Sequence, residues 1–266
     1  MTDPAEPSSE LLVQTEDGIC TVTLNRPESM NAASPSMLFA LTGLMEDLAK
    51  DDGLAALIIT GAGRAFSAGG DFGHFVKTSR EPDYARTTLD NARRFVEAML
   101  ALPMPVIAAV NGAAVGFGGT MAALCDLVLI SDRAFISEPH INIGLVVGDG
   151  ISVTWPLMMG MLKAKEYIYT GKRITPDQAV ACGLANRVVE HDQLVEAAAV
   201  LAAELAKQPR EALRETKALL NLYARRNMEL MFDDLFDRQF QRMQSGEHGA
   251  IVAAMIAKQK RTNEDA

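Results

Sequence analysis

The sequence contains little cysteine, little tryptophan and no long apolar run. Its 266 residues include three cysteines and one tryptophan. Cys20, Cys125 and Cys182 lie far apart among apolar or small neighbours, so we expect buried free thiols, as in a reducing cytoplasm, and neither disulfides nor a cysteine metal centre. No window approaches the roughly eighteen continuous apolar residues of a membrane span. We therefore expect a cytoplasmic protein that does not enter a membrane.

Positive charge is scarce as well. The chain has 25 lysines and arginines against 34 aspartates and glutamates, which gives a formal net charge of −9. Binding to nucleic acid needs a basic surface, so this balance argues against nucleic acid as the main partner. Residues 1–10 have neither the basic start nor the apolar stretch of a secretory signal, and we expect them to form a disordered tail.

Short apolar runs alternate with helical patterns over the first two thirds of the chain. Residues 19–24 alternate apolar and polar side chains after an Asp17-Gly18 turn, which predicts a hairpin with residues 11–15. Further strands are expected at residues 54–60, 106–110 and 127–131. Helices are expected at residues 34–48, 83–102, 153–159 and 163–169. This order predicts an α/β core.

The last third of the chain is almost entirely helical in pattern. It predicts four helices, at residues 191–207, 210–223, 228–243 and 247–260. The third of these has a broad apolar face, which we interpret as a possible subunit interface. That face is formed by Met228, Met231, Leu235 and Phe236.

Two glycine-rich loops carry most of the functional information. One spans Arg64 to Asp71 and the other spans Asn111 to Thr120. Each follows a short apolar run and precedes a segment with helical potential, so each can direct unpaired backbone N–H groups at one point. Two such donors together would form an oxyanion hole.

Five motifs in order resemble the crotonase superfamily, the enoyl-CoA hydratase/isomerase family, over residues 11–260. They are Leu24-Asn-Arg-Pro-Glu28 with Asn31-Ala32, Gly63 to Asp71, Pro105 to Gly112, the second glycine-rich loop through Cys125-Asp126, and Thr170-Gly171 with Ala179, Gly183 and Leu184. The resemblance implies an α/β fold, a crotonase (ClpP-like) spiral of repeated ββα units. Residues 11–200 would form this core, and residues 201–266 a helical region for oligomerisation and active-site closure.

The resemblance also implies acyl-CoA thioesters as substrates, with coenzyme A as part of the substrate and no separate cofactor, and a homotrimer or dimer of trimers. The thioester carbonyl would lie between the backbone N–H groups of Gly70 and Phe117. Ala68 and the segment Met30 to Ala32 would hold adenine and pantetheine. Candidates for the phosphates are Arg26, Arg64, Lys258 and Lys260. The remaining expected substrate contacts are Asp71, which also suits a helix N-cap, Phe72, Gly118, Thr120 and Pro139.

The sequence departs from the family's hydratase pattern at two positions. Thr120 and His140 stand where a hydratase of this family has the two glutamates that hold and activate water. Threonine has no ionised form near neutral pH, so the two-glutamate mechanism is not available. Asp149, in a Gly-Asp-Gly turn, and His140 are the remaining groups that could move protons. Hydration, double-bond isomerisation and thioester hydrolysis stay open, as does an acyl-CoA-binding protein without catalysis.

Other classes fit the residues less well. Ser67 and His248 occur in the order of an α/β-hydrolase, but Ala65 replaces the first glycine of a nucleophile elbow. Neither loop contains G-x-G-x-x-G, which argues against a dinucleotide site. His74 and His191 lack a partner ligand at helical spacing, so we expect no metal. An apolar acyl pocket is expected from Phe72, Phe75, Phe117, Val146 and Trp155.

Overall fold

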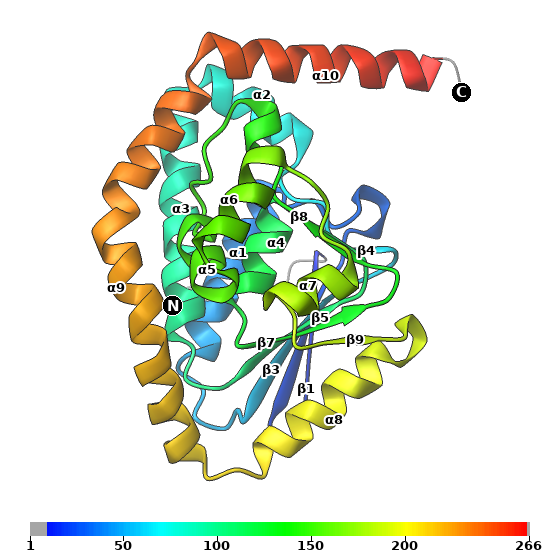
Figure 1. The fold of residues 1–266 in the computed structure, drawn as a ribbon, viewed down its shortest axis with the longest axis vertical. Coiled ribbons are helices and arrows are strands. Elements are labelled where there is room, and N and C mark those ends of the chain that lie inside the picture. Colours follow the sequence, from blue (N-terminus) through cyan, green and yellow to red (C-terminus); the bar gives the residue numbers. More distant parts are fainter. Residues whose placement is uncertain (1–9, 265–266) are drawn as a thin grey trace, which may run out of the picture.

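The computed structural model describes residues 10–264, apart from the side chains of Phe72 and of residues 259–264. Residues 1–9, where the tail was expected, lie outside this part. The described chain forms a six-stranded sheet and a three-stranded sheet, surrounded by helices (Figure 1). The larger sheet has the order β1-β2-β3-β5-β7-β9. Its strands are Leu11–Glu16, Ile19–Leu24, Ala56–Gly61, Val106–Val110, Leu127–Ser131 and Arg187–Val189.

The predicted hairpin and central strands are confirmed. β1 and β2 pair antiparallel through the turn at Asp17 and Gly18, and every later pairing in the large sheet is parallel. β5 and β7 have the predicted bounds, while β3 begins two residues later than expected. β5 is buried along its whole length, because helices or strands cover both faces, as is usual in parallel sheets.

The smaller sheet was not predicted. It pairs β4 (Ala65–Ser67), β6 (Ala113–Val115) and β8 (Phe135–Ser137) in parallel. Each of these strands follows a strand of the large sheet and precedes a helical segment, which confirms the repeated ββα units. Three residues are too short to show the period-2 pattern of a strand, so the sequence gives no local signal for them.

The predicted helices of the core are present. α1 (Pro35–Leu48) begins at Ser34, whose side chain accepts a 3.0 Å hydrogen bond from the N–H of Met37. α2 (Phe72–Arg80) is capped by Asp71, and α3 (Pro82–Ala101) follows it. The remaining core helices are α4 (Phe117–Leu124), α5 (Ile151–Met159), α6 (Met161–Thr170), α7 (Pro176–Cys182) and α8 (Leu194–Ala206).

The C-terminal helices differ from the prediction. Residues 210–223 and 228–243 belong to a single helix, α9 (Arg210–Met243), because the intervening Ala-Arg-Arg-Asn contains no glycine or proline to end it. α9 packs along α3, and α10 (Gly246–Glu264) runs across the end of the molecule and packs against α2 (Figure 1). Met228 and Leu235 are buried in the same chain, so most of the face interpreted as a subunit interface is an internal contact; Met231 is exposed.

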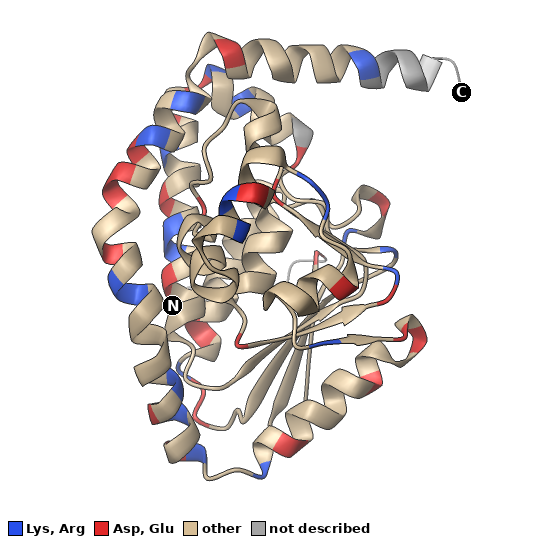
Figure 2. Cartoon of the chain, viewed as in Figure 1, with Lys and Arg blue, Asp and Glu red and all other residues tan. Residues whose placement is uncertain are grey.

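Charged side chains lie mainly on helices and loops, and the strands of the large sheet carry few of them (Figure 2). Cys20 and Cys125 are buried and Cys182 is half-buried, and all three are free. Within the described residues, no helix is long and apolar enough to cross a membrane.

Candidate active site

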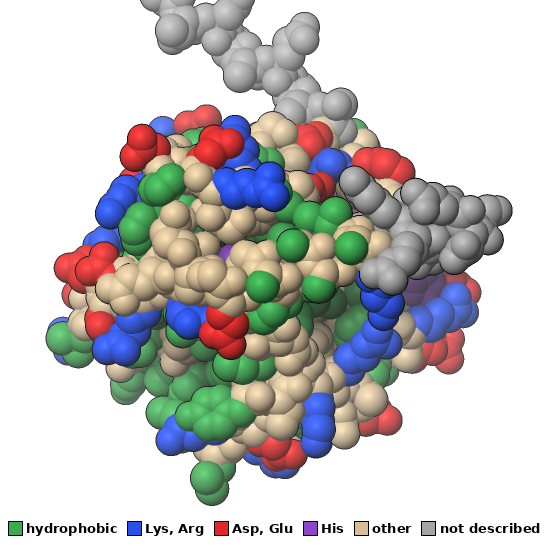
Figure 3. All heavy atoms as spheres, turned by 90° about the horizontal axis from the view of Figure 1, so that it is seen from above, with side chains coloured by type: hydrophobic (Ala, Val, Ile, Leu, Met, Phe, Trp, Pro, Cys, Tyr) green, Lys and Arg blue, Asp and Glu red, His purple; other side chains and the backbone are tan. Residues whose placement is uncertain are grey.

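A cavity of about 220 Å³ lies between the glycine-rich loops and helices α2, α3, α9 and α10. Glycines and apolar side chains form most of its wall. Viewed from the α10 end, hydrophobic side chains gather over the middle of the molecule, and charged ones lie mostly toward its rim (Figure 3). Among the described residues, five polar side chains line the cavity: His74, Thr88, His140, Asp149 and Gln239.

Gly70 and Phe117 both line this cavity. Gly70 follows β4, and Phe117 is the first residue of α4. Neither backbone N–H donates a hydrogen bond to another group of the described chain, so both remain available to a ligand. A Cβ atom on Gly70 would lie 2.7 Å from Cζ of Phe75, so a larger residue there would have to displace this ring.

Asp149 lies in the loop before α5 and is fixed by Thr120. Oγ1 of Thr120 donates a 2.7 Å hydrogen bond to Oδ2 of Asp149, and Thr120 itself is buried on α4. The other oxygen, Oδ1, is buried and has no partner within the described chain. Burial raises the pKa of Asp149, while the charge of His140 and the hydrogen bond from Thr120 partly oppose that rise.

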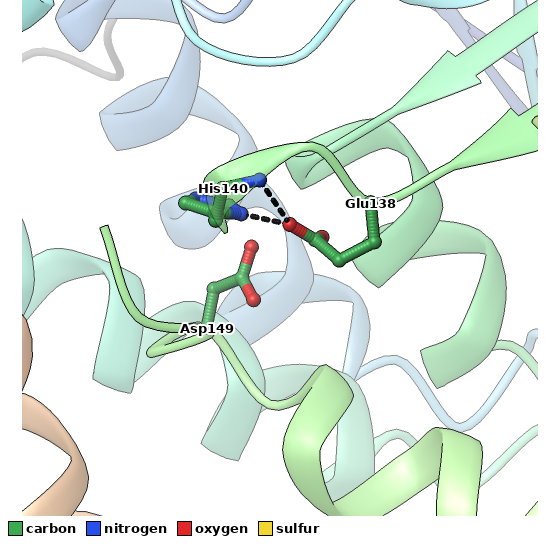
Figure 4. Close-up of side chains that lie close together, drawn as sticks. All are labelled: Glu138, His140 and Asp149. Carbon is green, nitrogen blue, oxygen red and sulfur yellow. Dashed lines mark hydrogen bonds and ion pairs between the residues drawn. The ribbon is translucent and has the colours of Figure 1, made fainter. Parts of the chain in front are cut away.

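His140 forms an ion pair with Glu138 (Figure 4). Its Nδ1 donates to Oε1 of Glu138, and its backbone N–H donates to the same oxygen at 3.0 Å. Burial by itself would lower the pKa of His140, but the carboxylates of Glu138 and Asp149 outweigh that effect and raise it to about 9. The two carboxylates therefore favour the protonated ring, which can donate hydrogen bonds or a proton.

Asp149 presents a carboxyl group to the cavity, and Glu138 does not. Glu138 is buried and bound to His140, and it does not line the cavity. Among the described residues, Asp149 provides the one carboxylate in the cavity wall. Thr120 stands where a hydratase of this family has one of its two glutamates. In this structure its hydroxyl holds the carboxylate of Asp149 through a hydrogen bond.

Glu138, His140 and Asp149 each offer one ligand atom, and these atoms lie within 4.8 Å of one another. That spacing could accommodate a cation. In this structure, however, Nδ1 of His140 is already paired with the carboxylate of Glu138. The donor set therefore fits an ion pair beside a carboxylate better than a metal centre.

Two more predicted contacts, Ala68 and Pro139, line the cavity. Gly118 does not, because it packs against Ser67, whose carbonyl oxygen would be 2.5 Å from a Cβ atom on Gly118. The side chain of Phe72 lies outside the described part. Of the expected pocket residues, Phe75 and Phe117 line the cavity, whereas Trp155 is wholly buried in the core. Val146 is not part of the described cavity wall.

Three of the residues expected at coenzyme A, Arg26, Met30 and Ala32, lie on the segment before α1. Met30 and Ala32 are outside the described cavity wall. The guanidinium of Arg26 lies 3.1 Å from Glu10 and donates a 2.6 Å hydrogen bond to the carbonyl of Ala32. Asp71 accepts a hydrogen bond from Gly73 as the cap of α2, and it lies 3.9 Å from Arg26. The guanidinium of Arg26 therefore contacts both Ala32 and Asp71, which lie on the two loops expected to hold the nucleotide. The side chain of Lys260 lies outside the described part.

The α/β-hydrolase interpretation is wrong. Ser67 is buried in β4, where its hydroxyl donates to the carbonyl of Asn31. His248 is also buried, and its Nδ1 lies 2.6 Å from the carbonyl oxygen of Ile143. The hydroxyl and the ring are therefore engaged with separate backbone groups, and the sheet order is not that of a hydrolase.

The sequence reasoning missed Glu138, His74 and Gln239 as members of the site. Glu138 lies within the Ser-Glu-Pro-His segment, and its spacing from His140 was the available signal. His74 was considered only as a metal ligand and was rejected, because it lacks a partner at helical spacing. Gln239 is ninety residues from Asp149 in the chain, and no local pattern connects them.

Comparison with known proteins agrees with this architecture. Residues 14–251 match the family model described as enoyl-CoA hydratase/isomerase. A putative enoyl-CoA hydratase of Thermus thermophilus is 37% identical over 213 residues, covering 79% of this chain and 83% of the relative. The 1,2-epoxyphenylacetyl-CoA isomerase of Escherichia coli is 31% identical over 252 residues, covering 93% and 95%.

A solved structure leads to the same family. The crystal structure of an enoyl-CoA hydratase/isomerase from Mycobacterium paratuberculosis has a TM-score of 0.89 and 38% sequence identity, with coverage of 92% of this chain and 98% of the other. The chain belongs to the enoyl-CoA hydratase/isomerase family of the crotonase superfamily.

Proposed function

We propose that the protein isomerises an enoyl-CoA thioester by moving a double bond, with Asp149 as the single base. The observation that carries this proposal is the environment of the Asp149 carboxylate. One oxygen is held by Thr120, the other has no partner in the described chain, and the group lines the cavity. Isomerisation needs one group that takes a proton from one carbon and returns it to another. Hydration by two glutamates needs a pair that this site lacks.

The reaction is balanced with these groups alone. The carboxylate of Asp149 removes a proton from C2 of a 3-enoyl thioester, and the electron pair delocalises onto the thioester oxygen. The N–H groups of Gly70 and Phe117 stabilise that oxyanion, and each donor of this kind contributes about 2.7–4 kcal/mol in the transition state. The protonated Asp149 then returns the proton at C4. The pKa of Asp149, raised by burial, makes it a stronger base than an exposed carboxylate.

The imidazolium of His140 has a supporting role in this proposal. It lies beside Asp149, and its positive charge favours the ionised carboxylate before proton transfer. Two relatives are named as isomerases with no mention of a hydratase: the E. coli protein described above and a monofunctional enoyl-CoA isomerase of Mycobacterium smegmatis, with a TM-score of 0.70 and 31% identity.

The proposal is tested with trans-3-hexenoyl-CoA in deuterated water. We expect the absorbance of a conjugated enoyl thioester to appear, and mass spectrometry to show no gain of water. Asp149→Asn should lower kcat by about three orders of magnitude while the Kd for a saturated acyl-CoA changes little. Asp90→Asn, the same chemical change at an exposed position on α3, is the matched control. A hydrated or hydrolysed product, or an active Asp149→Asn variant, would disprove isomerisation by this residue.

A homotrimer, with residues 201–266 contributing to its contacts, is a separate proposal. Large apolar side chains of α9 are exposed in the single chain, including Leu219, Leu220 and Leu230. Such side chains usually become buried in an assembly. Size-exclusion chromatography with light scattering should give three or six times the 28.7 kDa chain mass, and a monomer would contradict the proposal.

A further inference from the structure

Gln239 is a buried amide in the cavity wall that the proposed reaction does not use. Its side chain, on α9, is 3% exposed, and Oε1 has no hydrogen-bond partner within the described chain. An unpaired polar atom in a buried position destabilises a fold, so its presence in a ligand cavity indicates a partner on the ligand.

The position of Gln239 is set by Gly148, next to the catalytic Asp149. A Cβ atom on Gly148 would lie 2.7 Å from Cβ of Gln239 and 3.1 Å from its Cδ. Glycine at this position therefore lets α9 approach the loop closely, which brings the amide of Gln239 beside the residue proposed to move the proton. A group bound by this amide would belong to the acyl part of the substrate, near the reacting carbons.

The other polar side chains of the cavity wall indicate whether the substituent bound by Gln239 is charged or neutral. His74 lines the cavity, and its Nδ1 lies 2.9 Å from the hydroxyl of Tyr84. Burial lowers the pKa of His74 to about 4, so this ring is neutral at pH 7. Thr88 is neutral as well. No lysine or arginine belongs to the described cavity wall, whereas Asp149 contributes a carboxyl group. An acyl chain ending in a carboxylate would meet no cation there except His140, which Glu138 already neutralises.

We propose that the acyl group of the substrate carries a neutral oxygen substituent, a carbonyl or a hydroxyl, which the Gln239 amide binds beside Asp149. A carbonyl would accept from Nε2, and a hydroxyl would donate to Oε1. A plain alkyl chain would leave the amide unpaired. Sites built around a buried hydrogen-bonding group discriminate strongly against ligands that lack the matching atom. This inference rests on the proposed function only in taking an acyl-CoA as the ligand.

The test measures binding of saturated thioesters, which cannot isomerise, by titration calorimetry. Hexanoyl-CoA is compared with analogues that carry a keto or hydroxyl group at C4, C5 or C6, and with adipoyl-CoA. We expect at least one neutral oxygenated analogue to bind fivefold or more tightly than hexanoyl-CoA, and adipoyl-CoA to bind no more tightly. If every neutral analogue falls below fivefold, or if adipoyl-CoA binds best, the inference is wrong.

The variant Gln239→Leu should remove that preference, so that the oxygenated analogue and hexanoyl-CoA bind within twofold of each other. Met243→Leu changes an apolar wall residue of the same helix and should alter all affinities by one common factor, leaving the preference intact. If Gln239→Leu does not fold, Gln239→Met replaces it. A preference that persists without the amide would overturn the inference.

The outcomes separate the two proposals. If hexanoyl-CoA and all analogues fail to bind, both fail together. If the oxygenated analogue binds selectively but no enoyl-CoA is isomerised, the chemistry assigned to Asp149 fails while the substrate class stands.

Discussion

Thr120 on α4 donates a 2.7 Å hydrogen bond to the carboxylate of Asp149, twenty-nine residues further along the chain. This contact joins the second glycine-rich loop to the loop before α5. Thr120, whose side chain has no acid–base chemistry near neutral pH, therefore positions the carboxyl group that we propose as the base.

We predict that Thr120→Val lowers kcat for 3-hexenoyl-CoA about 10- to 100-fold, because a hydrogen bond to a charged group contributes about 1.5–3 kcal/mol. Since this bond lowers the pKa of Asp149, its loss should also move the acidic limb of the kcat–pH profile to higher pH. Steady-state kinetics from pH 5 to 9 measure both effects. Thr216→Val, at an exposed position of α9, is the control and should leave the profile unchanged.

Glu138→Gln should change how stability depends on pH. The folded-state pKa of His140 is about 9, above its ordinary value of 6.5, so its contribution is fully present below pH 6.5 and disappears as pH rises through 9. Without the negative charge of Glu138 the pKa of His140 falls, so the loss of stability between pH 6.5 and 9 should become shallower. Urea denaturation at several pH values measures this slope. An unchanged slope would mean that Glu138 does not raise the pKa of His140.

The pKa of His74 is shifted in the opposite direction from that of His140, so its effect on stability has the opposite dependence on pH. Its folded-state pKa is about 4, below the ordinary 6.5, so the unfolded chain binds a proton that the folded chain resists between these values. Stability should therefore fall as pH drops from 6.5 to 4, by up to about 3 kcal/mol for this group. His74→Gln should flatten this part of the curve. His191→Gln, at a half-buried histidine that follows β9 and is not part of the described cavity wall, is the comparison and should retain the fall.

Gly148→Ala should destabilise the protein by about 1–3 kcal/mol, because the new methyl group would overlap the side chain of Gln239 and push α9 outward. Chemical denaturation gives the change in unfolding free energy. Gly249→Ala, within α10 with no atom within 4 Å of the added Cβ, should instead be neutral or slightly stabilising. Equal effects of the two substitutions would show that the contact between Gly148 and Gln239 is not tight.

Local patterns predicted the central strands and most helices, because their periodicity and caps are encoded over a few residues. The Ser34 cap and the bounds of β5 and β7 are of this kind. The three strands of the small sheet were missed, because pairing between distant segments, and not a local pattern, makes them strands. The break predicted near residue 225 was wrong, since nothing in Ala-Arg-Arg-Asn interrupts a helix.

The candidate site was predicted in part. The two glycine-rich loops, Asp149 and His140 do meet at one cavity. Residue spacing does not reveal side-chain geometry. It therefore could not predict the hydrogen bond from Thr120 to Asp149, or the effect of Glu138 on the pKa of His140. Gln239 could not have been found from the sequence, because its relation to Gly148 exists only once α9 has packed.

Because α9 is one uninterrupted helix, it connects two distant parts of the protein. At about 1.5 Å per residue, Lys217 and Gln239 are separated by about 33 Å of unbroken helix. Nζ of Lys217 lies 2.7 Å from Oδ2 of Asp126 and donates a 2.7 Å hydrogen bond to the carbonyl oxygen of Met104. One continuous helix therefore connects the loops that bind Lys217 with the cavity wall that contains Gln239.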